Sequence, residues 1–262
     1  MSAMKFDKPI EGMRVMVTAG ASGIGRSIAD TLIANGATVA VCDVSDDFLG
    51  DFRKAHPTCY ATKADVASDK DVEAFFAGAQ KALGGLDALI NNAGIAGPTG
   101  RVEDITPADW RRCIEVCLTG QFLCAHFAVP LIRKAGGGAI VNMSSAAGRF
   151  GYAFRTPYSS AKWGVIGLTQ SLAKEVGPDN IRVNAVLPGI VDGPRMQGVI
   201  RARAEQVGIS YDEMEERYLE KVSLRRMVSQ DDVANTVLFL LSPAGKNISG
   251  QSLGVCGNVE AL

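Results

Sequence analysis

The chain has 262 residues, of which 47% are apolar and 21% are charged, and its net charge is −1. This is ordinary globular composition, and the near-zero charge gives no support for a nucleic acid or an anionic membrane as a partner. The length is sufficient for one large α/β domain or for two small domains.

The N-terminal residues 1–11 are polar and mixed in charge and lack the apolar core of a signal peptide, so we expect a cytoplasmic protein. The longest apolar stretch, 113–132, is interrupted by polar side chains, which indicates a buried amphipathic helix rather than a membrane span. Six cysteines show no CxxC pairing and no metal-ligand spacing with His56 or His126. We therefore expect reduced, mostly buried thiols and no metal site.

The first predicted unit begins with a β-branched, apolar strand at 14–18, followed by a glycine-rich turn at 19–25. Apolar residues with helical spacing come next, and then a second strand at 37–42 that ends at Asp43. Strand, glycine turn, helix, strand and acid is the order of a mononucleotide-binding unit, in which the helix N-terminus binds phosphate. The glycine spacing departs from the strict G-x-G-x-x-G pattern, so a merely tight corner remains the alternative.

Asp43 is placed to accept hydrogen bonds from both hydroxyls of an adenosine ribose, and it would repel a 2′-phosphate. It therefore favours NAD over NADP as the cofactor. The alternative is that Asp43 only caps the helix expected over 46–54.

The rest of the chain repeats the alternation of strands and helices. Further strands are expected at 58–61, 86–90, 139–143, 181–187 and 252–255, and helices at 69–83, 107–135, from 157 onward and at 231–241. This alternation predicts one doubly wound parallel sheet in a single domain spanning 1–262. The charged segment 192–227 is long for a connection, and we expect it to close over the site as a lid.

Tyr158 and Lys162 lie four residues apart on the helix expected after Pro157, with Thr156 as its N-cap, so they share one face. A neighbouring ammonium favours the phenolate form of a tyrosine, which makes the pair a candidate acid/base. Ser145 lies at the end of the fifth predicted strand, where its hydroxyl could hold a substrate oxygen. Taken alone, such a Tyr–Lys pair is common on surface helices, and that alternative stays open here.

Taken together, these motifs resemble the short-chain dehydrogenase/reductase family, in the family's order, from about Gly12 to Gly257. The resemblance rests on the turn at 18–25, Asp65-Val66, the N-N-A-G motif at 91–94, the set of Ser145, Tyr158 and Lys162, and the segments 182–184 and 188–189. It implies a Rossmann-type sheet with strand order 3-2-1-4-5-6-7, a nicotinamide cofactor, and a homotetramer or homodimer.

The resemblance also implies roles for individual residues. Tyr158 is expected to act as the general acid/base, Lys162 to bind the nicotinamide ribose, and Ser145 to donate a hydrogen bond to the substrate oxygen. The cofactor contacts it implies are Gly20, Ser22, Gly23, Ile24, Gly25, Asp43, Asp65, Val66, Asn92, Ala93, Gly94, Tyr158, Lys162, Pro188, Gly189, Ile190 and Val191.

The sequence departs from the family pattern at four positions. Ala19 replaces a turn glycine, and if that position needs a positive φ, the neighbouring Gly20 is expected to take up the turn. Cys117 replaces an asparagine of the proton relay, and a thiol is a weak hydrogen-bond partner. Gly193 replaces a threonine that often contacts the nicotinamide amide, and Cys256 replaces a C-terminal aspartate.

The substrate side is expected to involve Arg149, Tyr152 and Arg155, between Ser145 and Tyr158, together with Arg195 on the lid. Guanidinium groups there suggest an anionic substrate that carries a carboxylate, sulfonate or phosphate. The alternative is that these arginines are solvated or pair with acids of the lid.

The expected function is an NAD-dependent oxidoreductase for a small secondary alcohol or ketone, such as a hydroxy acid, sugar acid or hydroxysulfonate. An epimerase or dehydratase on the same fold, and a non-catalytic nucleotide-binding protein, remain alternatives. Residues 258–262 are apolar enough to dock on a neighbouring subunit.

Overall fold

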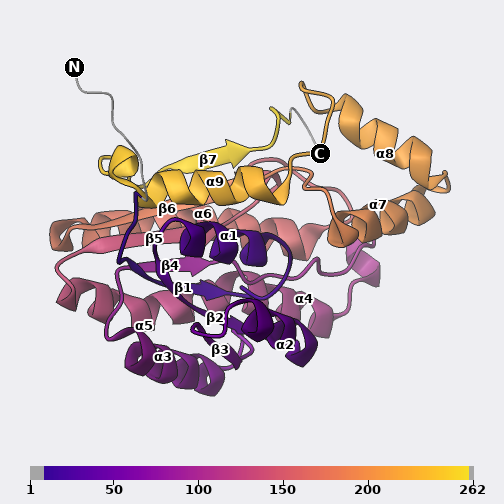
Figure 1. Cartoon of the computed structure of the whole chain (residues 1–262). Helices are drawn as coiled ribbons and strands as arrows, with labels where there is room; N and C mark the ends of the chain where they lie inside the picture. The colour runs from indigo at the N-terminus through magenta and orange to yellow at the C-terminus, as the bar shows by residue number, and fades with distance from the viewer. Residues whose placement is uncertain (1–8, 260–262) are drawn as a thin grey trace.

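The computed structural model describes residues 9–259, which form a parallel sheet covered by helices on both faces (Figure 1). Within these residues the sheet has seven strands in the order β3-β2-β1-β4-β5-β6-β7, which confirms the predicted topology. The strands are β1 (Arg14–Thr18), β2 (Thr38–Asp43), β3 (Tyr60–Lys63), β4 (Ala88–Asn91), β5 (Gly138–Met143), β6 (Ile181–Pro188) and β7 (Ser252–Val255).

Two helical layers bury the two faces of the sheet. The helices are α1 (Gly23–Ala34), α2 (Asp46–Ala55), α3 (Asp69–Leu83), α4 (Pro107–Ile114), α5 (Gly120–Lys134), α6 (Thr156–Val176), α7 (Pro194–Val207), α8 (Tyr211–Glu220) and α9 (Gln230–Leu241). Val15 and Val17 of β1 pack with α1, α2 and α9, whereas Met16 packs on the opposite face with α3 and α5. Because both faces are covered, the central strands β1, β2, β4, β5 and β6 are mostly apolar and buried rather than alternating.

The chain reverses direction at the carboxyl ends of the strands, where the predicted site residues gather. Asp43 ends β2, Asn91 ends β4 and Pro188 ends β6, while Ser145 follows β5 by two residues. Strands β1 and β4 are adjacent although β2 and β3 lie on the other side of β1. In α/β sheets, ligands bind at such a switch in strand order, beside the carboxyl ends of the strands.

The helix expected over 107–135 is interrupted by a π-helical turn, Glu115–Thr119, between α4 and α5. The first residue of α5 is Gly120, and a glycine is needed there because the helix lies close to the loop that follows β3. A Cβ on Gly120 would lie 2.8 Å from Val66 Cγ2. By length and composition the run 107–134 could cross a membrane, but Cys124 and Ile132 within this run are wholly buried in the core of the domain.

The predicted cap of α6 differs from the structure, and the alternative that Asp43 caps α2 is excluded. Helix α6 begins at Thr156 with Arg155 at the cap position, so Thr156 is not the N-cap, and its hydroxyl is buried without a partner. Helix α2 is capped by Ser45, whose Oγ accepts the Phe48 N–H at 3.3 Å. Asp43 is therefore not the cap of α2, and its carboxylate remains at the end of β2.

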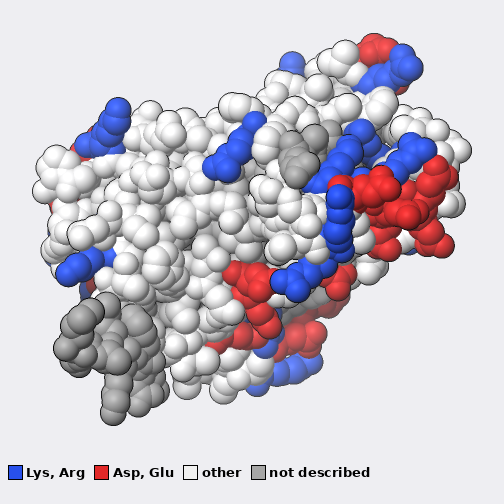
Figure 2. Space-filling view, turned by 90° about the horizontal axis from the view of Figure 1, so that it is seen from above, with Lys and Arg blue, Asp and Glu red and all other residues white. Residues whose placement is uncertain are grey.

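The lid-like segment 192–227 folds as α7 and α8, which project beyond the sheet at one end of the molecule (Figure 1). It has its own apolar cluster, which includes Ile200, Met214 and Tyr218. Acidic and basic side chains gather on the same end (Figure 2). Val259 packs into this cluster, whereas the rest of the docking segment predicted at the C-terminus, 260–262, lies outside the described residues.

The left-handed turn after β1 is made by Ala19, not by Gly20 as predicted. Ala19 has φ 48°, while Gly20 is needed for packing, because a Cβ there would lie 2.7 Å from Val41 Cγ1. An L-residue in the left-handed region carries a steric cost of about 1–2 kcal/mol. The turn therefore holds strain next to the expected phosphate site.

Replacing Ala19 with glycine should relieve this strain and raise the free energy of unfolding by about 1 kcal/mol. The thermal midpoint should rise by roughly 2–4 °C, measured by calorimetry or circular dichroism. Ala74→Gly, in an exposed position of α3, is the matched control and should lower stability by about 1 kcal/mol. A loss of stability in Ala19→Gly would contradict the assignment of strain.

Candidate active site

The structure brings Tyr158 and Lys162 together at the start of α6. Lys162 is only 3% exposed, and its Nζ lies 5.6 Å from the centroid of the Tyr158 ring. The same Nζ donates a hydrogen bond of 2.7 Å to the Met143 carbonyl at the end of β5. A buried ammonium needs such partners, so β5 fixes the side chain that stands beside the phenol.

Ser145 is held beside α6 by a group of short contacts. Ser144 Oγ donates to the Lys162 carbonyl at 2.7 Å, and Ser159 Oγ donates to the Ala147 carbonyl at 2.8 Å. Ser145 Oγ accepts the Ala147 N–H at 3.1 Å, which leaves its own O–H to donate elsewhere. Serine, tyrosine and lysine are thus anchored on the same strand–helix junction.

The glycine-rich turn is shaped for close approach of a phosphate. A Cβ on Gly25 would overlap the Ala19 carbonyl and the Asn92 amide, whereas Gly23 has φ 54° and open space around it. Helix α1 has no side-chain cap and no acidic residue in its first turn, so its first N–H groups are available to an anion.

The Thr18 hydroxyl links this turn to the N-N-A-G motif. Its Oγ1 accepts the N–H groups of Asn92 at 3.0 Å and of Ala93 at 2.9 Å. The Asn92 side chain donates back to the carbonyls of Thr18 and Ala19 at 3.0 and 3.1 Å. Gly94 follows, and a Cβ there would lie 3.5 Å from Lys162 Nζ, so its absence leaves room beside the ammonium.

The remaining predicted cofactor positions also lie at the carboxyl edge of the sheet. Asp43 is buried and accepts the N–H groups of Ala21 at 3.4 Å and of Ser45 at 3.2 Å. Asp65 accepts the Ala67 N–H at 3.0 Å and pairs with Arg112 at 2.7 Å. These acceptors and the open glycine turn fit the ribose and phosphate groups of a dinucleotide.

The residues at and after the end of β6 lie at the same carboxyl edge of the sheet, beside β7. The Gly189 N–H donates to the Val255 carbonyl at 2.9 Å, and a Cβ on Gly189 would lie 2.7 Å from Cys256 Cβ. The Ile190 carbonyl accepts the Val228 N–H, and Val191 forms a bridge with Val228. The backbone from 188 to 191 is therefore held by β7 and by Val228, which directly follows the lid-like segment 192–227.

Cys117, which stands in the π-helical turn, faces the same space as Lys162. Its Sγ accepts the Ile95 N–H at 3.4 Å and would lie 3.7 Å from a Cβ on Gly94. A hydrogen bond from Cys113 lowers the pKa of the Cys117 thiol, with help from Lys162 and against the effect of burial. The pKa of Cys113 is raised by that hydrogen bond and by burial. A thiol with a lowered pKa thus stands at the position where the family pattern has an asparagine.

The three predicted arginines occupy different surroundings. Arg149 is exposed and donates to the Ser252 carbonyl on β7 at 2.9 Å. Arg195 is exposed on α7 and donates to the Gly94 carbonyl at 3.1 Å, beside the space next to Lys162. Arg155 is 2% exposed and lies against Tyr158. The structure therefore brings Arg155 and Arg195, but not Arg149, to the Tyr158 side.

Tyr152 contacts the lid. Its hydroxyl lies 2.5 Å from the hydroxyl of Tyr218 on α8, and burial raises its pKa. Arg203 of α7 lies 5.6 Å from the centroid of the Tyr152 ring and donates to the Ala153 carbonyl. These contacts fasten the loop before α6 to α7 and α8.

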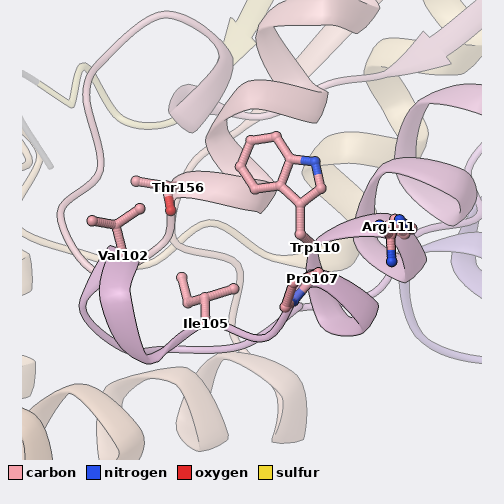
Figure 3. A pocket seen from close by; sticks show the side chains of 6 residues that line it. All are labelled: Val102, Ile105, Pro107, Trp110, Arg111 and Thr156. Atoms are coloured by element: carbon pink, nitrogen blue, oxygen red, sulfur yellow. The ribbon is translucent and has the colours of Figure 1, made fainter.

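A cavity of about 270 Å³ lies between the start of α4 and the start of α6 (Figure 3). Its lining residues are Val102, Ile105, Pro107, Trp110, Arg111 and Thr156. It does not include Ser145, Tyr158 or Lys162, so this mostly apolar cavity is distinct from the candidate active site.

Comparisons with known proteins agree with this arrangement. A family model described as enoyl-(acyl carrier protein) reductase matches residues 18–258. The chain belongs to the short-chain dehydrogenase/reductase family. This dehydrogenase/reductase is an enzyme of the oxidoreductase class that acts on CH–OH groups.

Named relatives cover nearly the whole dehydrogenase/reductase chain. Cis-4-hydroxycyclohexanecarboxylate dehydrogenase of Sinomonas cyclohexanicum is 37% identical over 94% of this chain and 96% of its own. Sorbitol-6-phosphate 2-dehydrogenase of Escherichia coli (strain K12) is 33% identical over 92% of this chain and 96% of its own. A crystal structure of NAD+-bound xylitol dehydrogenase has a TM-score of 0.90 and 26% identity, covering 95% of this chain and 99% of that one.

Sequence reasoning missed several residues of this dehydrogenase/reductase site. It did not place Cys113 beside Cys117, although their four-residue spacing on a predicted helix was visible. It did not foresee the contacts of Tyr218 and Arg203 with Tyr152, because they join segments about 50 to 65 residues apart. It also gave no sign that Arg155 would be buried.

Proposed function

We propose that the protein is an NAD-dependent dehydrogenase or reductase whose substrate is a small secondary alcohol, or the matching ketone, with an anionic group. The observation that carries the proposal is the anchored set of Ser145, Tyr158 and Lys162 at the end of β5, beside an open glycine turn. A nicotinamide cofactor, when bound, supplies the hydride acceptor or donor.

Tyr158 acts as the general base in the oxidation direction. Its phenolate oxygen takes the hydroxyl proton of the alcohol as the hydride leaves the carbinol carbon. Lys162, held by the Met143 carbonyl, places its positive charge beside the phenol and favours the phenolate. Ser145 donates a hydrogen bond to the substrate oxygen and holds it in place during the transfer.

NAD is preferred over NADP because Asp43 is a buried carboxylate at the end of β2. The backbone N–H groups of Ala21 and Ser45 hold it there. A carboxylate in this position accepts ribose hydroxyls and repels a 2′-phosphate. The NAD+-bound xylitol dehydrogenase with the same fold supports this preference.

The substrate's anionic group is bound by Arg195, an exposed guanidinium beside the space next to Lys162. A guanidinium can hold a carboxylate or phosphate with two hydrogen bonds. Two relatives are named for hydroxycyclohexanecarboxylates and one for sorbitol 6-phosphate, and these compounds combine a hydroxyl with an anion. An alicyclic hydroxy acid is therefore the first substrate to test.

The protein assembles with copies of itself, as a homotetramer or homodimer, through the outer surface of α4 to α6. Trp110, Phe122 and Trp163 lie on these helices with 39%, 52% and 52% of their surface exposed. Exposed large aromatic side chains on neighbouring helices are typical of contact surfaces between proteins.

Tyr158→Phe should abolish turnover while leaving cofactor binding nearly intact, because only the phenol proton is lost. A fall in kcat of about 10²–10⁴-fold is expected for the loss of a general acid/base. Turnover is followed by absorbance at the reduced cofactor band, and binding by its fluorescence. Tyr60→Phe in β3 is the matched control. A variant that keeps more than about a tenth of wild-type kcat would contradict the assignment.

Asp43→Ala should narrow the preference for NAD by removing the repulsion of the 2′-phosphate. The ratio of kcat/KM for the two cofactors measures this preference. Ser45→Ala, which removes the cap of α2 but keeps the carboxylate, should lower stability without changing the ratio. Equal use of NADP by the wild-type enzyme would show that Asp43 does not select the cofactor.

A hydroxy acid should be oxidised better than its neutral carboxamide, because only the acid forms charge-assisted hydrogen bonds with Arg195. Arg195→Gln should reduce kcat/KM for the acid by about 10- to 100-fold and leave the carboxamide nearly unaffected. Arg149→Gln is the comparison, since its guanidinium is held at β7. If the wild-type enzyme has a higher kcat/KM for neutral alcohols than for hydroxy acids, the proposal of an anionic substrate is wrong.

A further inference from the structure

Arg155 is a buried positive charge without a carboxylate partner among the described residues. Its Nη2 donates to the Ala96 carbonyl at 2.5 Å, while its Nε and Nη1 are buried and make no hydrogen bond with any of residues 9–259. Burying an ion costs several kcal/mol unless an opposite charge or enough hydrogen bonds compensate for it. We therefore expect a negative charge to form near the Arg155 guanidinium during the catalytic cycle.

The guanidinium lies over the ring that carries the proposed acid/base. Its Cζ is 5.0 Å from the centroid of the Tyr158 ring and 5.2 Å from that of Tyr152. Lys162 Nζ is 5.6 Å from the same Tyr158 ring. The phenol is therefore flanked by two cations, one from its own helix and one from the residue that precedes the helix.

The other charged groups near the phenol make the second cation significant. Cys113 and Cys117 pack against Tyr158 from the helix opposite, and Arg195 reaches Gly94 from α7. The hydrogen bond from Cys113 lowers the pKa of Cys117, and the Cys117 thiol also donates to the Ile95 carbonyl at 3.5 Å. Of the two cations, Arg155 lies closer to the Tyr158 ring, at 5.0 Å from its centroid against 5.6 Å for Lys162.

We propose that Arg155 is a positioning residue that acts through Tyr158, by stabilising its phenolate and so setting the pH at which the enzyme becomes active. This inference rests on the proposed role of Tyr158 as general base. The alcohol proton passes to the Tyr158 oxygen as the hydride departs, and the phenol then releases that proton to solvent. The buried guanidinium is compensated in the phenolate state and uncompensated in the phenol state.

The test is the pH profile of kcat/KM for alcohol oxidation, measured with a hydroxy acid and with its neutral carboxamide. Arg155→Gln keeps an N–H donor for the Ala96 carbonyl but removes the charge. The Arg155→Gln variant should raise the midpoint of the acidic limb of the profile by about one pH unit for both substrates. Below that midpoint, kcat/KM should fall about tenfold relative to the wild type. Activity should recover at higher pH, because the phenolate then forms without the cation.

Three further variants make the result specific. Arg155→Lys keeps the charge and should restore most of the wild-type midpoint. Arg155→Met replaces a buried charge with an apolar side chain, a change that buried sites often tolerate, and should give the same shift as the glutamine variant. Arg101→Gln, which removes an exposed arginine, should leave the midpoint unchanged.

An unchanged midpoint in the folded Arg155→Gln or Arg155→Met variant would overturn the inference. A loss confined to the hydroxy acid would also overturn it, because that result assigns Arg155 to the substrate's anion. Tyr158→Phe separates this failure from failure of the proposed function. If that variant is inactive while the Arg155 variants show no shift, only the role of Arg155 is wrong, and if it turns over, the acid/base assignment itself fails.

Discussion

The buried ammonium of Lys162 is the constraint on which the active site depends. The Nζ of Lys162 donates to the Met143 carbonyl, and the backbone carbonyl of Lys162 accepts a hydrogen bond from Ser144 Oγ. These two hydrogen bonds join the end of β5 to the first turns of α6. An ammonium this deep cannot be left without partners. Because these bonds fix α6, Tyr158 stands one turn before the cation and Ser145 lies beside it. The acid/base is thus placed by the strand–helix junction rather than by a mobile loop.

Several charged groups surround this junction. Lys162, Arg155 and Arg195 contribute positive charge within or beside the site, and the thiol of Cys117 can supply a negative one. Net positive charge favours both a tyrosinate and a substrate anion, and hydrogen bonds to charged groups are stronger than neutral ones. One arrangement of arginines therefore accounts for the proposed base and for the proposed preference for hydroxy acids.

Sequence motifs were enough to predict the fold and the cluster of site residues, because they depend on local pattern. The alternation of strands and helices, the glycine turn and the Tyr158–Lys162 spacing follow from residues close in the chain, whereas the strand order came from the resemblance to the family. The exceptions depend on packing between distant segments. Only the approach of β2 shows why Gly20 cannot be replaced and why Ala19 takes the left-handed turn. The burial of Arg155 depends in the same way on Ala96 and on two tyrosine rings.

Transfer of deuterium from substrate to cofactor tests the central claim most directly. An alicyclic hydroxy acid labelled with deuterium at its carbinol carbon is incubated with the enzyme and NAD, and the reduced cofactor is analysed by mass spectrometry. The account predicts one deuterium in each reduced cofactor formed, with one ketone formed per transfer. Retention of deuterium in a product that is epimerised or dehydrated, with no reduced cofactor accumulating, would contradict it and would assign the fold to chemistry without net oxidation.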